Sequence, residues 1–431
     1  QAFAKKHAGN ARVHFDEVVN FKLKLLREVY LHEAPAVPQD FAAEQWVRQY
    51  AVYRCLKDQF DGVPWFAWPP EHQEPYSREQ IENYLQKHPS DTGFYIWLQY
   101  VLDNQLREVR AYADERGVYI KGDMPIMLER DSADVWLYPQ LFNHKLRAGA
   151  PPDMFSPEGQ NWGFPVYNWS EHFAEDFAWW RERIRRLDRY FSAYRIDHVL
   201  GFFRLWCIPE GKHSGRDGYY LPADAAEQLA QGKKILSVLR ETSNMLPCAE
   251  DLGVVPDYVR PALAELGILS LKVYRWEAEN NIPKDPQGYP FLSLATSSVH
   301  DSSNLREWLA TEDGKITGVV VSNGAVSVVQ INEFLSRLYR SPSMIVMIPL
   351  QDLLALEDKL HGKAAEFPEA MGAGHLGDAG GGRALSQQRG TREVHLHFDI
   401  RLNDRPLDAW SLLAQNAVGP DFLALATVIV A

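Results

Sequence analysis

An arginine, an aspartate and a histidine stand at the end of an apolar run in the segment YRIDHVLGFFRLWCIPE, residues 194–210. A buried strand tolerates charged side chains only where they are paired or take part in chemistry. Arg195 and Asp197 are two residues apart, so on a strand both side chains point to one face, where the guanidinium stabilises the negative carboxylate. We therefore expect Arg195, Asp197 and His198 to belong to a functional site.

Acidic residues end several other apolar runs. Asp123 stands in KGDMPI, Glu250 in AEDLG and Asp301 in SVHD. The intervals of 53 residues from Asp197 to Glu250 and of 51 residues from Glu250 to Asp301 each accommodate a strand, a helix and their loops. Carboxylates that meet at one rim of a sheet suit metal binding, proton abstraction or acid/base chemistry on a glycosidic bond.

Breaking a glycosidic bond with retention requires two carboxyl groups that differ in protonation. One must stay ionised to attack the anomeric carbon, while the other keeps a proton for the leaving oxygen. Asp197, beside Arg195, is the better nucleophile. Glu250 follows the apolar segment NMLPCA, and such surroundings raise the pKa of a carboxyl group, so Glu250 is the better acid/base.

The order of apolar and helical segments indicates how these residues are positioned. Apolar spacings of three and four predict helices over 12–32, 41–60 and 77–118. Beyond residue 118, short apolar runs predict six strands, over 118–126, 191–199, 246–253, 268–276, 294–301 and 343–353. Acidic residues at the ends of several strands predict a (β/α) barrel with its site at the carboxyl ends of those strands.

Composition and charge limit the function further. The 431 residues carry a formal net charge of −12, which argues against nucleic acid or an anionic membrane as a partner. The three cysteines have no zinc or disulfide spacing, and neither a signal peptide nor a long apolar span is visible, so we expect a cytoplasmic protein. Many aromatic residues lie in Gly/Pro-rich stretches, at 62–70 and 159–169. These stretches are typical either of a sugar-binding face or of the core of a large domain.

Six segments stand in order between residues 121 and 356: KGDMPIMLERDSADVW, GAPPDMFSPEGQNWGFPVYNW, YRIDHVLGFFRLWCIP, AEDLGVVPDYV, TSSVHDSSNLREW and PLQDLLAL. Together they resemble the 4-α-glucanotransferases, which are the amylomaltases and disproportionating enzymes of the α-amylase superfamily. Residues 41–120 are similar to the helical insertion of that family. The resemblance implies an α/β fold, a (β/α)8 (TIM) barrel with a helical insertion subdomain.

The resemblance also implies a function, a 4-α-glucanotransferase without cofactor or metal that acts on maltooligosaccharides or α-1,4-glucan. Asp197 would form a β-glucosyl-enzyme, Glu250 would act as acid/base, and Asp301 would stabilise the oxocarbenium-like transition state. Substrate binding is implied for Arg195, His198, His300, Asp123 and Trp162. Trp162 would be a stacking platform on a loop over the cleft. An acceptor sugar 4-OH, rather than water, would take the glucan from the enzyme.

Two parts of the chain depart from the family pattern. Nothing before residue 41 resembles the family's upstream segment, which carries the first barrel strands, and the end of the chain is a Gly/Ala-rich stretch with an unrelated tail. We therefore expect an incomplete barrel. Residues 1–117 would be a helical segment and insertion subdomain, 118–356 the catalytic barrel core, and 357–431 a linker and atypical tail that is either scrambled or supplies substitute strands.

Other interpretations of the same residues stay open. A retaining α-glucan hydrolase would differ only in how well water is excluded and an acceptor is bound. An inactive glucan-binding fragment would bind glucan without turnover. The His–Asp pairs at 197–198 and 300–301, or the His-x-His at 395–397, would instead suit a metal-dependent hydrolase.

Two further predictions concern acidic residues outside this set. Asp131 and Asp134, in RDSADVW, have the residue type and position of helix N-caps, and we expect them to cap a helix rather than touch a sugar. Asp352, in PLQDLLAL, is expected to fix the last barrel loop.

Overall fold

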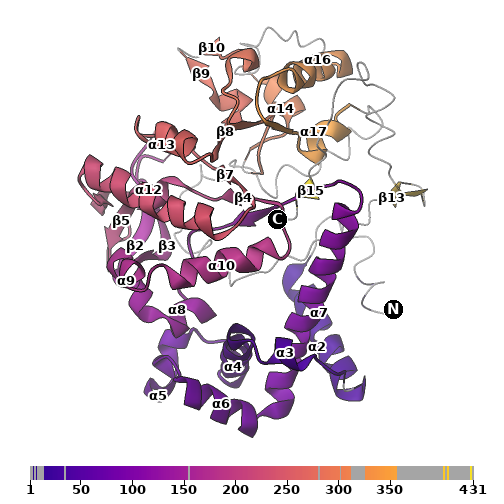
Figure 1. Ribbon diagram of the computed structural model, residues 1–431, viewed down its shortest axis with the longest axis vertical. Helices are drawn as coiled ribbons and strands as arrows, with labels where there is room; N and C mark the ends of the chain where they lie inside the picture. Colours follow the sequence, from indigo (N-terminus) through magenta and orange to yellow (C-terminus); the bar gives the residue numbers. More distant parts are fainter. Residues whose placement is uncertain are drawn as a thin grey trace. The chain divides into compact units, whose positions relative to one another are not determined.

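A computed structural model describes residues 14–33, 35–153, 156–279, 282–300, 302–311 and 326–356, together with positions 3 and 6 and short strands of the tail. The chain divides into two compact units (Figure 1). The first comprises Gln1–Glu108 and Asp131–Pro139, and the second comprises Val109–Arg130 and Gln140–Ala431. The expected division of the chain at residues 117 and 356 stays a prediction.

The first unit is built from helices. They are α2 (Phe15–Glu33), α3 (Gln39–Ala42), α4 (Gln45–Gln59), α5 (Pro70–Gln73), α6 (Arg78–Lys87), most of α7 (Pro89–Asp114) and α8 (Ala133–Leu137), with the 3-10 turn η1 (Trp65–Ala67). The helices predicted over 12–32 and 41–60 are confirmed within a few residues, and the stretch predicted to be helical over 77–118 contains α6 and α7. Pro89 begins α7 and disfavours helical backbone at the residue before it, so two helices form.

The Pro-rich stretch at 62–70 contributes tryptophans to the core of this unit. Trp68 is 2% exposed, and its ring centroid lies 5.7 Å from that of Tyr53 and 6.0 Å from that of Trp136. These rings stabilise the helices by apolar burial and by edge contacts. Of the two interpretations of this stretch, the core of a domain is therefore the correct one.

The segment RDSADVW begins helix α8, although Asp131 is not its cap. Ser132 is the N-cap, and its hydroxyl accepts a hydrogen bond from the Val135 amide. The Asp131 carboxylate accepts instead from Lys57 Nζ at 2.7 Å and from the Trp65 amide at 3.0 Å. The expectation for Asp131 is wrong because a partly buried ammonium is a stronger partner for a carboxylate than an unpaired helix amide.

The second unit contains a parallel sheet in the order β12–β11–β8–β7–β4–β1–β15. The strands are β12 (Ile345–Met347), β11 (Ser293–Thr296), β8 (Leu269–Val273), β7 (Leu246–Ala249), β4 (Ala193–Ile196), β1 (Ile120–Met124) and β15 (Val428–Ile429). Each of the six predicted strand runs overlaps one of them, and β15 comes from the tail and pairs with β1. Among the described strands β12 and β15 each have one partner, so the sheet is an open, incomplete (β/α) barrel, as expected.

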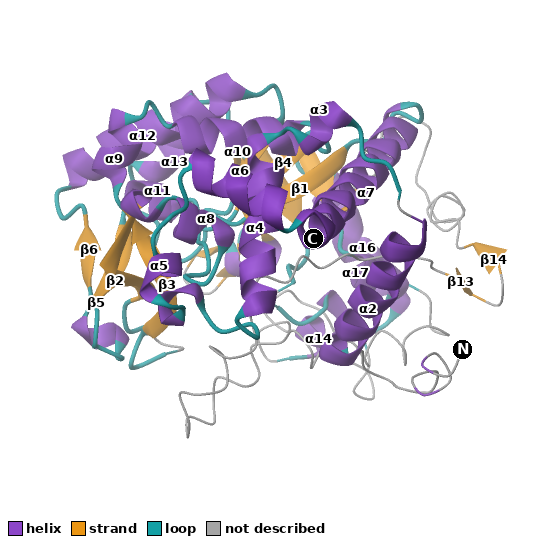
Figure 2. Cartoon of the chain, turned by 90° about the horizontal axis from the view of Figure 1, so that it is seen from below, coloured by secondary structure: helices purple, strands orange, loops and turns teal. Residues whose placement is uncertain are grey.

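Amphipathic helices cover this sheet. Three of them lie side by side along one face (Figure 1 and Figure 2): α10 (Ala178–Asp188), α12 (Ala225–Thr242) and α13 (Val259–Glu265). The other helices are α9 (Trp169–Ala174), α11 (Leu200–Phe203), α14 (Leu305–Ala310), α16 (Val328–Tyr339) and α17 (Leu350–Leu354). The Asp224 carboxylate caps α12, and Ser327 with Gln330 forms a capping box at the start of α16. These caps fix where the covering helices begin.

The second unit also holds an antiparallel sheet that the sequence did not predict. Its order is β3–β2–β5–β6, from β3 (Gln160–Tyr167), β2 (Phe142–Ala150), β5 (Leu205–Pro209) and β6 (Tyr219–Leu221). Register irregularities between β2 and β3, and Gly163 and Pro165 within β3, hide the alternation by which strands are recognised. Trp162 consequently lies in strand β3, and its expected place on a loop is wrong.

The register of the parallel sheet decides which side chains share its inner face. Asp123 on β1 pairs with Arg195 on β4, and Arg195 pairs with Cys248 on β7. Paired residues point to the same face of a sheet, and Glu250 stands two residues beyond Cys248. The strands themselves therefore bring the polar residues together.

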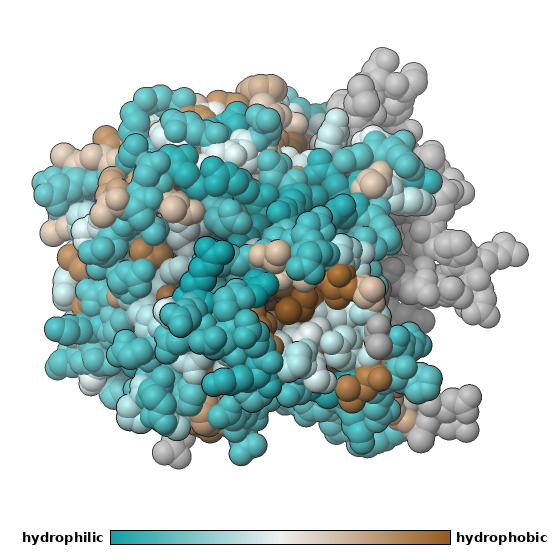
Figure 3. Space-filling view, turned by 60° about the horizontal axis from the view of Figure 1, so that its bottom comes forward, coloured by the Kyte–Doolittle hydropathy of each residue, from teal (hydrophilic) through white to brown (hydrophobic). Residues whose placement is uncertain are grey.

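Polar side chains cover most of the surface that the structure describes on the side of the molecule shown in Figure 3, with hydrophobic side chains in small areas. Helix α2 exposes Phe15, Leu25 and Leu31. Among the described helices, none is both long enough and apolar enough to cross a bilayer.

Candidate active site

One guanidinium holds three carboxylates at the ends of β1, β4 and β7, and we call these four residues the carboxylate cluster. Arg195 Nη1 donates to both carboxylate oxygens of Asp123, at 2.9 and 2.8 Å. Its Nη2 lies 2.8 Å from Asp197 Oδ1 and 2.5 Å from Glu250 Oε2. Burial alone would lower the pKa of Arg195, but the three carboxylates together raise it above its ordinary value. The guanidinium therefore stays charged and orients all three acids.

Glu250 is the most buried acid of the carboxylate cluster. Its side chain is 18% exposed, against 28% for Asp123 and 34% for Asp197. Burial, aided by the charge of Asp197, raises the pKa of Glu250 to about 7 although Arg195 opposes the shift. The apolar approach to Glu250 along β7 predicted this direction, because Cys248 and Ala249 are both buried.

Asp197 is held in a more open position. Its backbone amide donates to the Met124 carbonyl at 3.1 Å, and its carboxylate contacts Arg195. Asp197 and Glu250 therefore differ in burial, although they share a guanidinium. A pair that combines one open, cation-bound carboxylate with one buried carboxyl of raised pKa is suited to two-carboxylate chemistry on a glycosidic bond.

His198 connects this pair to the antiparallel sheet. Its amide donates to Glu250 Oε2 at 3.0 Å, and its φ of +46° lies in the left-handed region, which costs a non-glycine residue about 1–2 kcal/mol. Its ring lies edge-to-face against that of Trp162, with centroids 5.2 Å apart. Burial lowers the pKa of His198, and Asp197 opposes this shift. Strain of this kind is concentrated at functional sites.

Six of the eight predicted site residues come together in this part of the molecule: Asp123, Arg195, Asp197, His198, Glu250 and Trp162. His300 lies four residues beyond β11 and is exposed. Asp301 and the His-x-His at 395–397 lie outside the described residues. Within the described part of the chain, no group of three or more His, Cys, Asp or Glu side chains is arranged to hold a metal ion.

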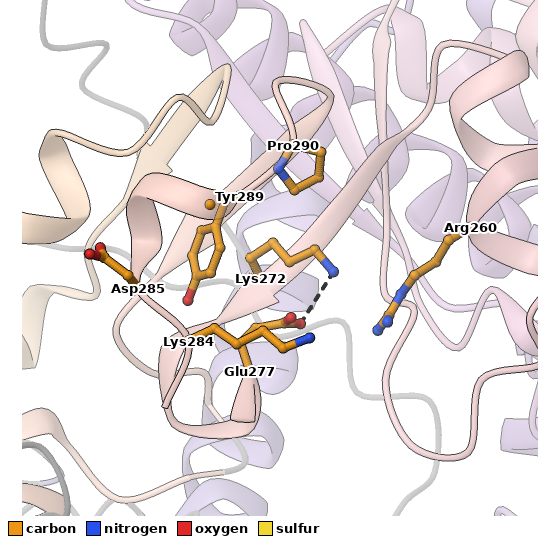
Figure 4. A pocket seen from close by; sticks show the side chains of 8 residues that line it. Arg260, Lys272, Glu277, Lys284, Asp285, Tyr289 and Pro290 are labelled. Carbon is orange, nitrogen blue, oxygen red and sulfur yellow. Dashed lines mark hydrogen bonds and ion pairs between the residues drawn. The ribbon is translucent and has the colours of Figure 1, made fainter. Parts of the chain in front are cut away.

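Two cavities lie outside the carboxylate cluster. One of about 450 Å³, in the second unit, is lined by Arg260, Lys272, Glu277, Lys284, Asp285, Gly288, Tyr289 and Pro290. Figure 4 shows the charged ends of Lys272, Glu277 and Lys284 pointing toward one another. The other cavity, of about 1010 Å³, lies in the first unit and is lined mainly by residues of α4 and α6. Neither is lined by a predicted site residue, so the candidate site is assigned from the chemistry of the carboxylate cluster.

Comparison with known proteins identifies the family. The sequence profile described as 4-alpha-glucanotransferase, Glyco_hydro_77, matches residues 1–363. The chain belongs to this family. Family membership confirms the resemblance drawn from the six sequence segments.

Individual relatives agree with this assignment. The 4-alpha-glucanotransferase of Chlamydia trachomatis serovar D is 32% identical over 372 residues, which are 83% of this chain and 69% of the relative. That of Chlamydia pneumoniae is 38% identical over 268 residues, 61% of this chain and 49% of the relative, so the match spans about half of the relative's length. The amylomaltase from Streptococcus agalactiae, solved in complex with acarbose, is similar in structure with a TM-score of 0.63 at 27% identity, covering 77% of this chain and 66% of that one. The structural similarity thus confirms the predicted fold class.

Sequence reasoning missed one buried acid beside the carboxylate cluster. Asp251 is fully buried and binds Arg260, Ser270 and the Leu271 amide. It stands in the AEDLG segment, directly after Glu250. Both residues are acids at the end of an apolar run, and the sequence alone does not show that they have different roles. Asp352 accepts hydrogen bonds from Ser297 and Ser298, which follow β11, and from the Leu305 amide at the start of α14, while its expected role in fixing the last barrel loop stays a prediction.

Proposed function

We propose that the chain is a retaining 4-α-glucanotransferase, which transfers segments of α-1,4-glucan between maltooligosaccharides. The observation that carries the proposal is the sharing of Arg195 Nη2 by Asp197 and Glu250. Two carboxyl oxygens at 2.8 and 2.5 Å from one nitrogen lie closer together than the roughly 6.5–9.5 Å that separates the carboxyl groups of inverting enzymes. The pair therefore supports a double displacement with retention.

In the first step, Asp197 attacks the anomeric carbon of a bound glucan and the glycosidic bond breaks. Glu250 gives its proton to the departing sugar oxygen, so the products are a β-glucosyl-enzyme and a shorter glucan with a free 4-OH. A pKa of about 7 keeps about half of the Glu250 side chains protonated near neutral pH, which suits a general acid.

In the second step, the 4-OH of an acceptor sugar attacks the anomeric carbon of the glucosyl-enzyme. The bond from this carbon to Asp197 breaks with its electron pair returning to the carboxylate, and Glu250 takes the proton of the attacking hydroxyl. Both acids then regain their starting protonation. Water in place of the acceptor would give hydrolysis, so the ratio of the two reactions depends on how well water is excluded.

Substrate contacts are proposed for Asp123, Arg195, His198 and Trp162, which lie around this pair, and the family resemblance extends the proposal to His300 and Asp301. Trp162 offers an indole face to the apolar side of a sugar ring, and His198 offers a ring N–H to a hydroxyl beside it. For Asp301, the proposed stabilisation of the transition state follows from the family resemblance.

The substrate class and location complete the proposal. The amylomaltase from Streptococcus agalactiae was solved in complex with acarbose, and we propose that this chain binds acarbose at the carboxylate cluster, where α-1,4-glucan is the substrate. The free thiols of Cys55, Cys207 and Cys248 suit a reducing compartment, so the proposed location is the cytoplasm.

Incubation of the full chain with maltotriose alone tests the proposal. Transfer predicts glucose together with oligosaccharides longer than maltotriose. Asp197→Asn and Glu250→Gln should each lower the rate by about 1,000-fold, because each removes a group that the reaction requires. Glu265→Gln is the matched surface control, since this carboxylate is 63% exposed and pairs with Lys233, and it should keep the parental rate.

Two outcomes would contradict transfer. Glucose and maltose as the only products would identify a hydrolase. Acarbose binding, measured by calorimetry, without any turnover of maltotriose would identify a glucan-binding fragment, whose affinity Asp197→Asn and Glu250→Gln would leave intact.

A further inference from the structure

A buried aspartate stands directly behind the proposed acid/base. Asp251 follows Glu250 at the end of β7 and has no exposed surface. Its Oδ1 accepts from the Leu271 amide at 2.7 Å, and its Oδ2 accepts from Ser270 Oγ at 2.5 Å. Arg260 Nε donates to the same Oδ2 at 2.8 Å. One carboxylate thus ties the end of β7 to β8 and to helix α13.

These bonds lie where the backbone pairing of β7 and β8 stops. Cys248 pairs with Leu269 and Ala249 pairs with Ser270, so the next position in register would be Leu271 opposite Glu250. The Leu271 amide is instead bonded to the side chain of Asp251. At the position of Glu250, the Asp251 carboxylate therefore replaces the backbone hydrogen bond that would otherwise join β7 to the Leu271 amide of β8.

On its other side, Glu250 is held by backbone bonds to β4 and its extension. The Glu250 amide donates to the Ile196 carbonyl at 3.0 Å, and the Glu250 carbonyl accepts from the Val199 amide at 3.2 Å. On the β8 side, the Asp251 carboxylate continues the contacts beyond the last paired residues, and Arg260 of α13 donates to it. On that side of the strand, the Asp251 side chain therefore anchors the residue next to Glu250.

We infer that Asp251 is a positioning residue that holds Glu250 in its buried place against Arg195. This inference rests on the proposed function, in which Glu250 is the acid/base. Burial is the largest cause of the raised pKa of Glu250. If the end of β7 loosens, water reaches the Glu250 carboxyl group and its pKa falls. The carboxyl group also loses its orientation toward the glycosidic oxygen.

Asp251→Asn tests the inference. The side-chain oxygen of asparagine can still accept from the Leu271 amide, but its NH2 group replaces the oxygen that accepts from Arg260 and Ser270. The first readout is the titration of the Glu250 carboxyl carbon by 13C NMR, assigned with Glu250→Gln. We expect its midpoint to fall by about one pH unit from the parental value. We also expect kcat to fall about 100-fold with little change in KM, and the basic limb of the kcat profile to move to lower pH.

Asp352→Asn is the matched control. Asp352 is also fully buried and also accepts three hydrogen bonds, from Ser297 Oγ, Ser298 Oγ and the Leu305 amide, at 2.6, 2.6 and 2.7 Å. Its replacement should lower the free energy of unfolding by a similar amount and leave the Glu250 titration unchanged. Ser270→Ala, which removes one bond of Asp251, should shift the titration in the same direction by less.

The outcomes separate this inference from the proposed function. A Glu250 midpoint that Asp251→Asn leaves at its parental value would overturn the inference, as would an equal shift in Asp352→Asn. Where Asp251→Asn does not fold, Ser270→Ala decides: a fall supports the inference and an unchanged midpoint overturns it. An absence of transfer by the parent chain would contradict the proposed function alone, because the NMR titration requires no turnover.

Discussion

The two halves of the parallel sheet have the same backbone arrangement but carry different side chains on their inner face. The inner face of β1, β4 and β7 carries charged side chains, Lys121, Asp123 and Arg195, with Glu250 just beyond. The same face of β8, β11 and β12 carries apolar side chains: Leu269, Leu271, Leu294, Ile345 and Met347. One half holds the candidate chemistry and the other holds a core. The comparison indicates that one sheet assigns apolar burial to one half and paired charges to the other.

The charged half is stable only while its charges are balanced. Buried carboxylates without a counter-charge destabilise a fold, and here two cations face three acids. Lys121 is 6% exposed, and its burial lowers its pKa although Asp123 and Cys248 oppose the shift. Arg195 contacts all three acids directly and is therefore the group on which the balance depends.

Removal of Arg195 should break the charged half most severely. Arg195→Ala leaves three carboxylates without their shared partner, so we expect the free energy of unfolding to fall by about 3–5 kcal/mol and transfer activity to be lost. Urea unfolding and the maltotriose assay measure the two effects. Arg216→Ala removes an exposed arginine paired with Glu158 and should change stability by less than about 0.5 kcal/mol. Equal losses in the two variants would contradict this account of the cluster.

A cavity in the apolar half should separate stability from chemistry. Leu294 is 2% exposed and packs in the core of β8, β11 and β12, so Leu294→Ala should lower the free energy of unfolding by about 3 kcal/mol. The folded fraction should keep the parental dependence of rate on pH, because the carboxylate cluster is untouched. A displaced pH profile in Leu294→Ala would show that the two halves are not separable.

A third expected effect is a pH dependence of stability that comes from Glu250. Its folded pKa of about 7 lies above its ordinary value of 4.5, so folded molecules retain a proton that unfolded molecules release between these values. The stabilising contribution is complete below the ordinary pKa and is lost as pH rises through the folded pKa. Between about pH 5 and about pH 8, the parent should therefore lose more unfolding free energy than Glu250→Gln, as measured by urea unfolding. Parallel curves for the two proteins would refute the raised pKa.

The sequence predicted the strands of both halves and the acids at the ends of the charged ones. Acids at strand ends, such as Asp197 and Glu250, can be recognised in the sequence because a charged residue at the end of an apolar run is rare unless it is paired or functional. The parallel strands were predicted from the runs themselves, because strands buried on both faces consist of short continuous apolar segments. The raised pKa of Glu250 followed from the apolar residues that precede it.

Contacts that depend on distant residues escaped prediction. The antiparallel sheet was missed because its irregular register interrupts the alternation of side chains, which also misplaced Trp162. Asp131 was taken for a helix cap because Lys57 and Trp65, its partners, are more than 60 residues away. Asp251 was passed over because only the register of β7 against β8 reveals what its side chain replaces.

Mass spectrometry of a trapped glycosyl-enzyme tests most directly whether Asp197 and Glu250 act together in breaking a glycosidic bond. Glu250→Gln is incubated with an α-maltosyl fluoride, whose fluoride departs without a proton, while the missing base slows the release of the sugar from the enzyme. The account predicts that the peptide containing Asp197 gains the mass of a maltosyl group, and that Asp197→Asn in the same background prevents it. Attachment to a different residue, or release of transfer products from the double variant, would contradict it.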